Sequence, residues 1–332
     1  ENKTAIWHSK CAFLLAIRDG LLATNSGQVE IGATDPLAEP FVDIRVGSNT
    51  VFRLYVFVLS EKLIVERAME SSVPPSMHAI ASVSQLWFLP ALRAKIHAKS
   101  IESPGICGAI QAAKKWMDNH LLLEPYLGPW VECTMAIAAS SSSSHALMMN
   151  WLFLLAHHAW RTTPLFWNAT PDMMTKFDEA VDHRKNWWVA SDLDPHCIYL
   201  RRPSEWESVR IETLARKALL HAEAKQWEKI KFHTDNSAVF DLLFTVKGND
   251  VAEIAKLLTE QFRKYFTFHY SQTHRIIGVV FDGFALQSGT AAKSNAMITV
   301  VDNLAVPDFA VLVEKMKALL KGSVSSVKVK KI

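Results

Sequence analysis

The spacing of apolar residues changes twice along this chain, and the two changes limit the folds open to it. Up to about residue 72, the apolar pattern marks one helix and then a pair of short strands. Helical spacing dominates from residue 73 to about residue 225, and strands and helices mix again from residue 226 onward. The pattern predicts an α+β protein with three domains, which span residues 1–72, 73–225 and 226–332.

The first domain is expected to combine a helix with a β-hairpin. Apolar residues recur at four-residue steps from Phe13 onward, which predicts an amphipathic helix within residues 5–24. Residues 41–46 and 51–59 are rich in β-branched and aromatic side chains, and the Gly-Ser-Asn sequence between them supplies turn chemistry. These two runs therefore predict the strands of the hairpin.

The later domains differ in their mixture of elements. The second domain is predicted to be mainly helical, with helices near residues 76–88, 90–99, 105–123, 130–139, 145–159, 171–184 and 204–224. The third is predicted to be an α/β unit, with strands near residues 239–246, 267–270, 276–281 and 297–301 and helices at 251–265 and 307–320.

Composition excludes several classes of protein. Hydrophobic residues make up 49% of the chain and charged residues 21%, which predicts a soluble globular protein with real cores. The net charge of +3 does not by itself indicate nucleic-acid binding. The most apolar stretch, residues 146–156, falls short of the roughly 18 residues of a membrane span, so no membrane partner is expected. Four widely spaced cysteines favour a reducing compartment over a disulfide framework.

The pattern closest to a catalytic site is a glycine-containing turn before a strand with a carboxylate. Ile31-Gly32-Ala33 precedes Asp43-Ile44-Arg45. Nucleotidyltransferases of the polymerase-beta type place two alternate carboxylates on such a strand, because residues two apart share a face and can hold two Mg²⁺ ions.

This pattern is broken in the present chain. Arg45 stands where the second metal ligand belongs, Ala33 replaces the Gly or Ser that faces the phosphates, and residues 51–59 lack a third carboxylate. We expect Asp43 to be a degenerate metal-site position in a pseudoenzyme that holds no metal and needs no cofactor. Alternatively, this strand corresponds to the one that carries the third carboxylate in such enzymes, which leaves Asp43 as a relic.

Basic residues cluster in two places that suit RNA phosphates. Lys114 and Lys115 precede Trp116 on a predicted helix, which fits either phosphate and base contacts or a solvated face beside a buried Trp. The end of the chain, from residue 315, holds six lysines and no acid, which fits either an RNA-docking tail or a solvated end. The candidate RNA-binding residues are Lys114, Lys115, Lys328, Lys330 and Lys331.

Two further groups of potential ligands have simpler interpretations. Asp192, Asp194 and His196 alternate in the sequence, but Pro195 among them favours a solvated loop over a metal site. The consecutive residues 157 and 158 are both His, and they diverge by about 100° on a helix, so one is expected in the core and one on the surface.

Five segments, taken in order, resemble the C-terminal part of the nucleolar RNA-associated protein family (Nrap, also called nucleolar protein 6). The hairpin resembles the family's HVDVxxDGxVFRxRV, and the helix around Lys114 resembles its RLAKRWxxxHLL, with Gln111 and Ala112 in place of Arg-Leu. The segments are residues 41–54, 109–122, 151–165, 277–280 and 308–312. The likeness covers nearly the whole chain, and it rests on the collinear order of the segments.

The resemblance implies a nucleotidyltransferase-like domain, a helical domain of the poly(A)-polymerase/oligoadenylate-synthetase type and a final α/β domain. It also implies a nucleolar, noncatalytic scaffold of the small-subunit processome, which matures pre-18S ribosomal RNA in ribosome biogenesis. The partners would be pre-ribosomal proteins, with pre-rRNA as a further candidate ligand. Two alternatives stay open: a template-independent RNA nucleotidyltransferase whose missing acids lie upstream of Glu1, and a single-stranded RNA binder that uses the polymerase-like cleft.

Overall fold

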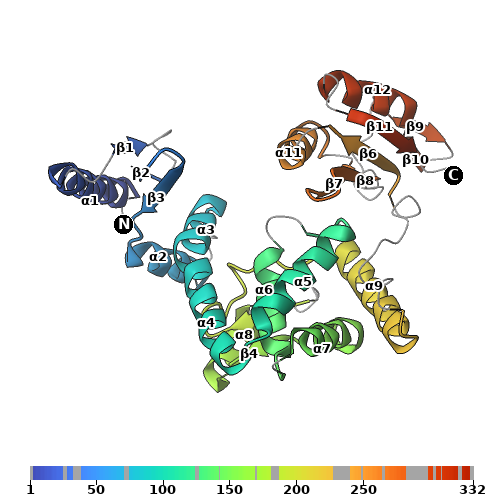
Figure 1. The fold of residues 1–332 in the computed structure, drawn as a ribbon, viewed down its shortest axis with the longest axis horizontal. Helices are drawn as coiled ribbons and strands as arrows, with labels where there is room; N and C mark the ends of the chain where they lie inside the picture. Colours follow the sequence, from blue (N-terminus) through green and yellow to red (C-terminus); the bar gives the residue numbers. More distant parts are fainter. Residues whose placement is uncertain are drawn as a thin grey trace. The chain divides into compact units, whose positions relative to one another are not determined.

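The computed structural model has the α+β fold that the sequence predicts (Figure 1). The chain divides into two compact units, Glu1–Lys99 with Trp160–Arg201, and Ser100–Ala159 with Arg202–Ile332. The domain boundaries predicted after residues 72 and 225 stay predictions. The structure describes residues 3–24, 28–32, 39–70, 75–123, 127–141, 143–168, 170–180, 187–226, 240–247, 250–263, 266–281, 298–301, 304–307, 309–320 and 324–329.

The first unit contains a three-stranded antiparallel sheet in the order β1-β2-β3. β1 (Gln28–Gly32) pairs with β2 (Phe41–Val46), and β2 pairs with β3 (Thr50–Tyr55). Gly47, in the turn between β2 and β3, has a φ of 69°, in the left-handed region that glycine adopts without strain. The predicted hairpin is confirmed, although its second strand ends at Tyr55 rather than at residue 59.

The helix α1 (Lys3–Ala23) packs against β1 and β2. Leu14 of the helix and Val42 of β2 are both fully buried, so α1 covers the sheet face that carries Val42. The predicted helix is confirmed, but Phe13 is 61% exposed and lies outside its buried stripe. The buried stripe passes through Lys10 and Leu14, and Phe13 lies about 100° around the helix from Leu14.

The buried Lys10 is held by two carboxylates. Its side chain is 2% exposed, and Nζ lies 2.5 Å from Glu39 Oε2 and 2.7 Å from Glu61 Oε1. Ser82 Oγ also donates a hydrogen bond to Glu39 Oε1 over 2.5 Å. These contacts join α1 to α2 (Leu59–Glu70), to α3 (Met77–Val83) and to the residue two before β2. Paired acids are what allow an ammonium group to be buried.

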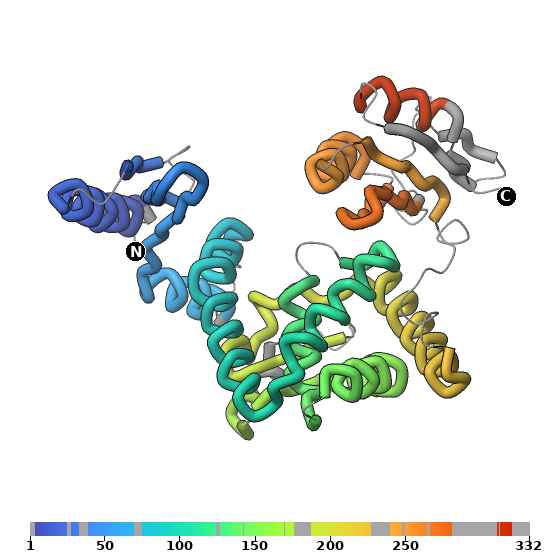
Figure 2. Tube along the Cα trace, in the orientation of Figure 1, coloured from blue at the N-terminus to red at the C-terminus, as the bar shows by residue number. Residues whose placement is uncertain are grey.

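The helices of the first unit continue through an irregular turn. A π-helical turn at Ser84–Phe88 links α3 to α4 (Leu89–Glu102), and the tube in Figure 2 runs from one into the other without a break. Pro90 has no N–H for an α-helical bond, and a π turn before it accommodates this loss. A small parallel sheet pairs β4 (Leu165–Trp167) with β5 (Val189–Ser191), and α8 (Pro171–Ala180) lies between them in sequence.

The second unit begins with a helical part. Its helices are α5 (Ile106–Asn119), α6 (Gly128–Ala138), α7 (Ser144–His157) and α9 (Glu205–Glu223). Ser204 and Glu207 form a capping box at the start of α9, which satisfies two backbone N–H groups. Trp116, Trp130 and Trp151 are buried in this part, and Trp151 Nε1 donates to Thr134 Oγ1 over 2.9 Å.

The rest of the second unit is an α/β arrangement. Four antiparallel strands follow the order β11-β6-β8-β7, and α11 (Val251–Phe262) and α12 (Phe309–Leu320) supply side chains to the core of that sheet. The strands are β6 (Leu242–Val246), β7 (Phe266–Ser271), β8 (Ile276–Phe281) and β11 (Val324–Val329). A second, two-stranded sheet pairs β9 (Ile298–Val301) with β10 (Leu304–Pro307).

Buried polar contacts join α5 to the turn after β7. Ser271 Oγ donates to Asp118 Oδ2 over 3.0 Å and accepts from the backbone N–H of His274 over 3.0 Å. His274 Nε2 lies 2.8 Å from Asn119 Oδ1. Ser271 is fully buried, so these bonds are shielded from water and connect the helical part to the α/β part of the same unit.

We predict that Ser271→Ala lowers the free energy of unfolding by about 1 to 3 kcal/mol, because Asp118 and the His274 amide both lose a buried partner. Urea unfolding followed by tryptophan fluorescence measures this loss. Thr213→Ala on the exposed side of α9, where the hydroxyl bonds only Val209 O, is the matched control and should change stability by less than about 0.5 kcal/mol. Equal effects of the two substitutions would contradict the role of Ser271.

Candidate functional site

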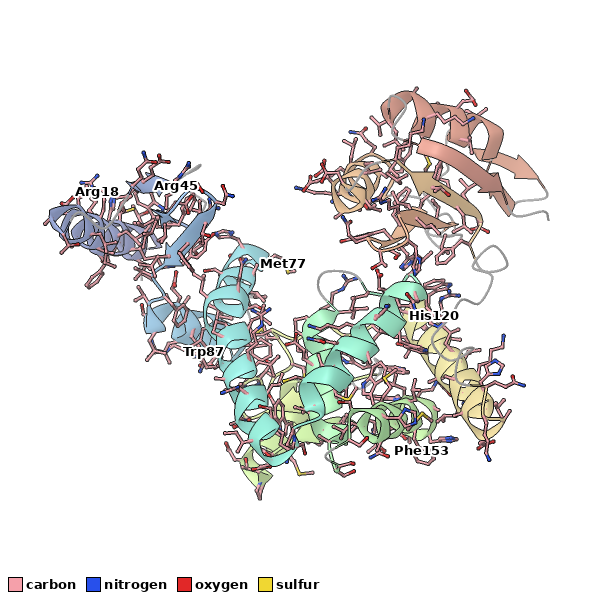
Figure 3. The ribbon with its side chains drawn as sticks, viewed as in Figure 1. Arg18, Arg45, Met77, Trp87, His120 and Phe153 are labelled. Carbon is pink, nitrogen blue, oxygen red and sulfur yellow. The ribbon has the colours of Figure 1, made fainter. Side chains whose placement is uncertain are left out.

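One face of the three-stranded sheet carries the nucleotidyltransferase-like pattern. This face, opposite the one that α1 covers, is named here the open sheet face. The register places Asp43 between Glu30 of β1 and Arg53 of β3, and Arg45 follows on the same side of β2. Figure 3 marks Arg45 on this sheet and Arg18 on α1. The open sheet face consists of Gln28, Glu30, Gly32, Phe41, Asp43, Arg45, Val51, Arg53 and Tyr55.

Arg53 forms a bidentate ion pair with Asp43. Arg53 Nε donates to Asp43 Oδ1 over 2.7 Å, and Nη2 donates to Oδ2 over 2.8 Å. The guanidinium carbon lies 3.7 Å from the centre of the Phe41 ring, so an aromatic face supports the pair. The hydrogen bond from Arg53 is the main cause that lowers the pKa of Asp43, and the positive charges of Arg53 and Arg45 lower it further.

The ion pair decides what Asp43 can do chemically. Both carboxylate oxygens already accept hydrogen bonds from one guanidinium group, so a metal ion that used their remaining lone pairs would lie beside a cation that repels it. Across the described part of the chain, no three His, Cys, Asp or Glu side chains are grouped so that they could hold a metal ion.

Sequence reasoning identified Arg45 but missed Arg53 as the partner of Asp43. The signal was available, because a three-residue turn between the strands pairs Val46 with Thr50 and, counting outward, Asp43 with Arg53.

The predicted RNA-binding residues of α5 occupy different environments. Lys114 forms an ion pair with Glu132 of α6, whose side chain is only 10% exposed. Lys115 is exposed, and the neighbouring Trp116 is buried and meets Trp151 edge to face. The prediction that a base stacks on Trp116 is therefore wrong, and the alternative prediction of a buried Trp beside a solvated face is confirmed. Contacts of Lys114 and Lys115 with RNA stay a prediction.

The predicted lysine tail is in part a strand. Lys328 lies in β11, at one edge of the four-stranded sheet and opposite Leu243 of β6. Residues 324–329 are therefore not a free tail, because they pair antiparallel with β6, with a register shift between Val324 and Ser326. Lys330 and Lys331 lie outside the described residues.

Asp194 contradicts the prediction of a solvated loop. Its side chain is 1% exposed; Oδ1 accepts from the N–H of Ile198 over 2.8 Å, and Oδ2 accepts from Tyr199 and Leu200 over 2.9 and 3.0 Å. Asp192 instead pairs with Lys95. The two acids organise the loop and its attachment to α4, and this long-range role left no signal in the spacing.

The two consecutive histidines also differ from expectation. His157 is exposed and its ring contacts Phe153, with ring centres 4.4 Å apart (Figure 3 labels Phe153). His158 is half-buried, so neither ring lies in the core. The helix ends at His157, which places His158 beyond the helical geometry that the prediction assumed.

Comparison with known proteins adds one match. Residues 1–103 match the family model described as Nrap protein nucleotidyltransferase domain 4, a segment that contains the open sheet face and α1 to α4. A comparison with curated proteins finds no match. No helix among the described residues is both long and apolar enough to cross a membrane.

The environment of Asp194 predicts a pH dependence of stability. Burial is the largest cause and raises the pKa of Asp194 to about 6, against the opposing effect of the three backbone N–H groups. Because the pKa in the folded state exceeds the value of about 3.9 in the unfolded chain, the folded protein holds the proton more tightly. This stabilisation is complete below about pH 4 and is lost as the pH rises through about 6.

Asp194→Asn removes this titration. We expect the unfolding free energy of the natural protein, minus that of the variant, to fall by up to about 3 kcal/mol between pH 4 and pH 7. Urea unfolding at several pH values measures the difference, and Asp19→Asn on the exposed side of α1 is the control. A difference that stays constant over this range would contradict the prediction.

Proposed function

The chain belongs to the Nrap family through its domain over residues 1–103, and from this premise we propose that it is a noncatalytic scaffold of the small-subunit processome. The Nrap domain indicates a nucleolar protein of ribosome biogenesis. The finer proposal is that the chain acts in the maturation of pre-18S ribosomal RNA and binds pre-ribosomal proteins. Pre-rRNA is a further candidate ligand.

The observation that carries the noncatalytic part is the ion pair between Asp43 and Arg53. Two-metal nucleotidyl transfer needs carboxylate oxygens that bridge Mg²⁺ ions next to the nucleotide phosphates. In this domain the oxygens of Asp43 are engaged by Arg53, and Arg45 adds a second cation on the same side of β2. A cation in the ligand shell opposes a second cation, so the arrangement supports a pseudoenzyme.

Exposed apolar side chains support a scaffold role. Val46, Phe52 and Leu54 share the sheet face that α1 covers, yet they are 52%, 58% and 38% exposed. They lie on β2 and β3, and β3 is the edge strand of this sheet. Clustered apolar side chains at a sheet edge are typical of surfaces that bind protein partners.

We predict no nucleotide incorporation on an RNA primer by this chain with Mg²⁺ or Mn²⁺, because a metal ion at Asp43 would lie beside the cations of Arg53 and Arg45. A gel assay with labelled nucleotides measures incorporation. Activity that disappears in Asp43→Ala but persists in Asp19→Ala would establish the alternative, a template-independent nucleotidyltransferase. A longer chain with upstream residues belongs in the same assay, since further acids there could complete a site.

A pull-down from nuclear extract tests the partners. We expect small-subunit pre-ribosomal proteins, identified by mass spectrometry, to stay bound after nuclease treatment, and Phe52→Asp to reduce their capture. Phe153→Asp, at a similarly exposed Phe in the second unit, is the control. Loss of all partners with nuclease would favour the single-stranded RNA binder instead.

A further inference from the structure

We propose that the open sheet face binds a phosphate group of a nucleotide or of single-stranded RNA without a divalent metal. Arg53 and Arg45 would supply the positive charge that Mg²⁺ supplies in an active nucleotidyltransferase. The inference rests on the proposed loss of catalysis and adds a ligand class for the same face.

Arg53 has donors left for a ligand. An arginine carries five N–H groups in one plane, and Asp43 takes up two of those on Arg53. The hydroxyl of Tyr55 is a further hydrogen-bond partner, and the side chain of Arg53 is still 48% exposed. The bidentate contact with Asp43 and the Phe41 ring fix the orientation of the guanidinium plane. A phosphate can therefore meet positioned donors at a low entropic cost.

Arg45 provides the charge that the ion pair lacks. Asp43 and Arg53 neutralise each other, whereas Arg45 is exposed and lies opposite Val51, which carries no charge. Arg45 is close enough to Asp43 to lower its pKa, so the two guanidinium groups flank one carboxylate. The β2–β3 side of the face is thus positively charged.

Glu30 limits how strongly this face attracts anions. It is exposed and lies opposite Asp43 on β1, on the side away from Arg53. Its negative charge balances that of Arg45 over the whole face, which predicts weak binding centred on β2 and β3. Removing the Glu30 charge should therefore strengthen binding of the phosphate. If Arg45 had only a structural role and no phosphate bound at this face, removing the Glu30 charge would not strengthen binding.

Aromatic side chains favour a nucleotide over a bare anion. Phe41 and Tyr55 pair across β2 and β3, with ring centres 5.9 Å apart, and Tyr55 is 37% exposed. An exposed ring beside an arginine can stack on a base whose phosphate meets the guanidinium groups. Bases in a duplex are already stacked on one another, so the preferred ligand is a single strand or a free nucleotide.

Fluorescence anisotropy of a labelled single-stranded oligouridylate tests the proposal with the full chain at low salt. We expect equal affinity in EDTA and in Mg²⁺, and about tenfold weaker binding by Arg45→Gln. The slope of log affinity against log salt should also fall by about 0.7. Glu30→Gln should bind up to about fivefold more tightly. Arg18→Gln, at a partly exposed arginine of α1 that pairs with Asp19, is the matched control and should bind as the natural protein does.

The outcomes separate this proposal from the proposed function. Competition by ATP would identify a free nucleotide as the phosphate source, and competition by unlabelled RNA alone would identify the RNA backbone; both support the site. If Arg45→Gln binds the oligouridylate as tightly as Arg18→Gln does, the proposed phosphate site is wrong. The noncatalytic function still stands in that case, provided that incorporation is absent. Binding that needs Mg²⁺, together with incorporation that Asp43→Ala abolishes, overturns both. Arg53→Gln would remove a phosphate donor and also leave Asp43 without its partner, so its effect on binding would have two causes. The test therefore uses Arg45→Gln.

Discussion

The buried ammonium group of Lys10 is the interaction on which the first unit depends. It lies between the carboxylates of Glu39 and Glu61, and Ser82 donates to the first of these acids. Each of these four residues comes from a different part of the unit. Removing the ammonium group of Lys10 would leave these two carboxylates close together without a counterion, and breaking a buried ion pair in this way typically costs about 3 to 5 kcal/mol. The network therefore specifies how α1, α2 and α3 meet the start of β2.

The position of β2 in turn determines the chemistry of the open sheet face. Glu39 precedes the strand by two residues, and the short turn with Gly47 then aligns β3 against it. This alignment places a guanidinium group opposite Asp43, where a two-metal enzyme needs free carboxylate oxygens. A contact that belongs to the core of the unit thus positions the pair that argues against catalysis.

Local patterns were enough to predict much of the fold, and long-range pairs were not. The hairpin and most helices follow from period and turn chemistry, because those signals lie within a few residues of one another. α2 was missed because Glu61, Lys62 and Glu66 interrupt its apolar stripe, although the first of these acids is a partner of Lys10. The burial of Asp194 and the pairing of Lys114 with Glu132 depend on residues brought together by folding, which no spacing within one segment encodes.

Under the proposed function, an ion pair stands where an active nucleotidyltransferase would hold metal ions, a difference that would change function more than folding. Clustered carboxylates repel one another until a metal binds, so an active site of that kind is most stable when its metal ions are bound. On this sheet, Asp43 has a permanent counterion on the neighbouring strand, and the hairpin needs no metal to neutralise it.

Because Arg53 is half-exposed, solvent screens the ion pair between Asp43 and Arg53, and the contribution of this pair to stability is small. Its larger effect is to occupy the carboxylate oxygens while it leaves other guanidinium donors facing solvent. If the two proposals hold, the domain keeps the shape of a nucleotidyltransferase and an attraction for phosphate, without the capacity for phosphoryl chemistry.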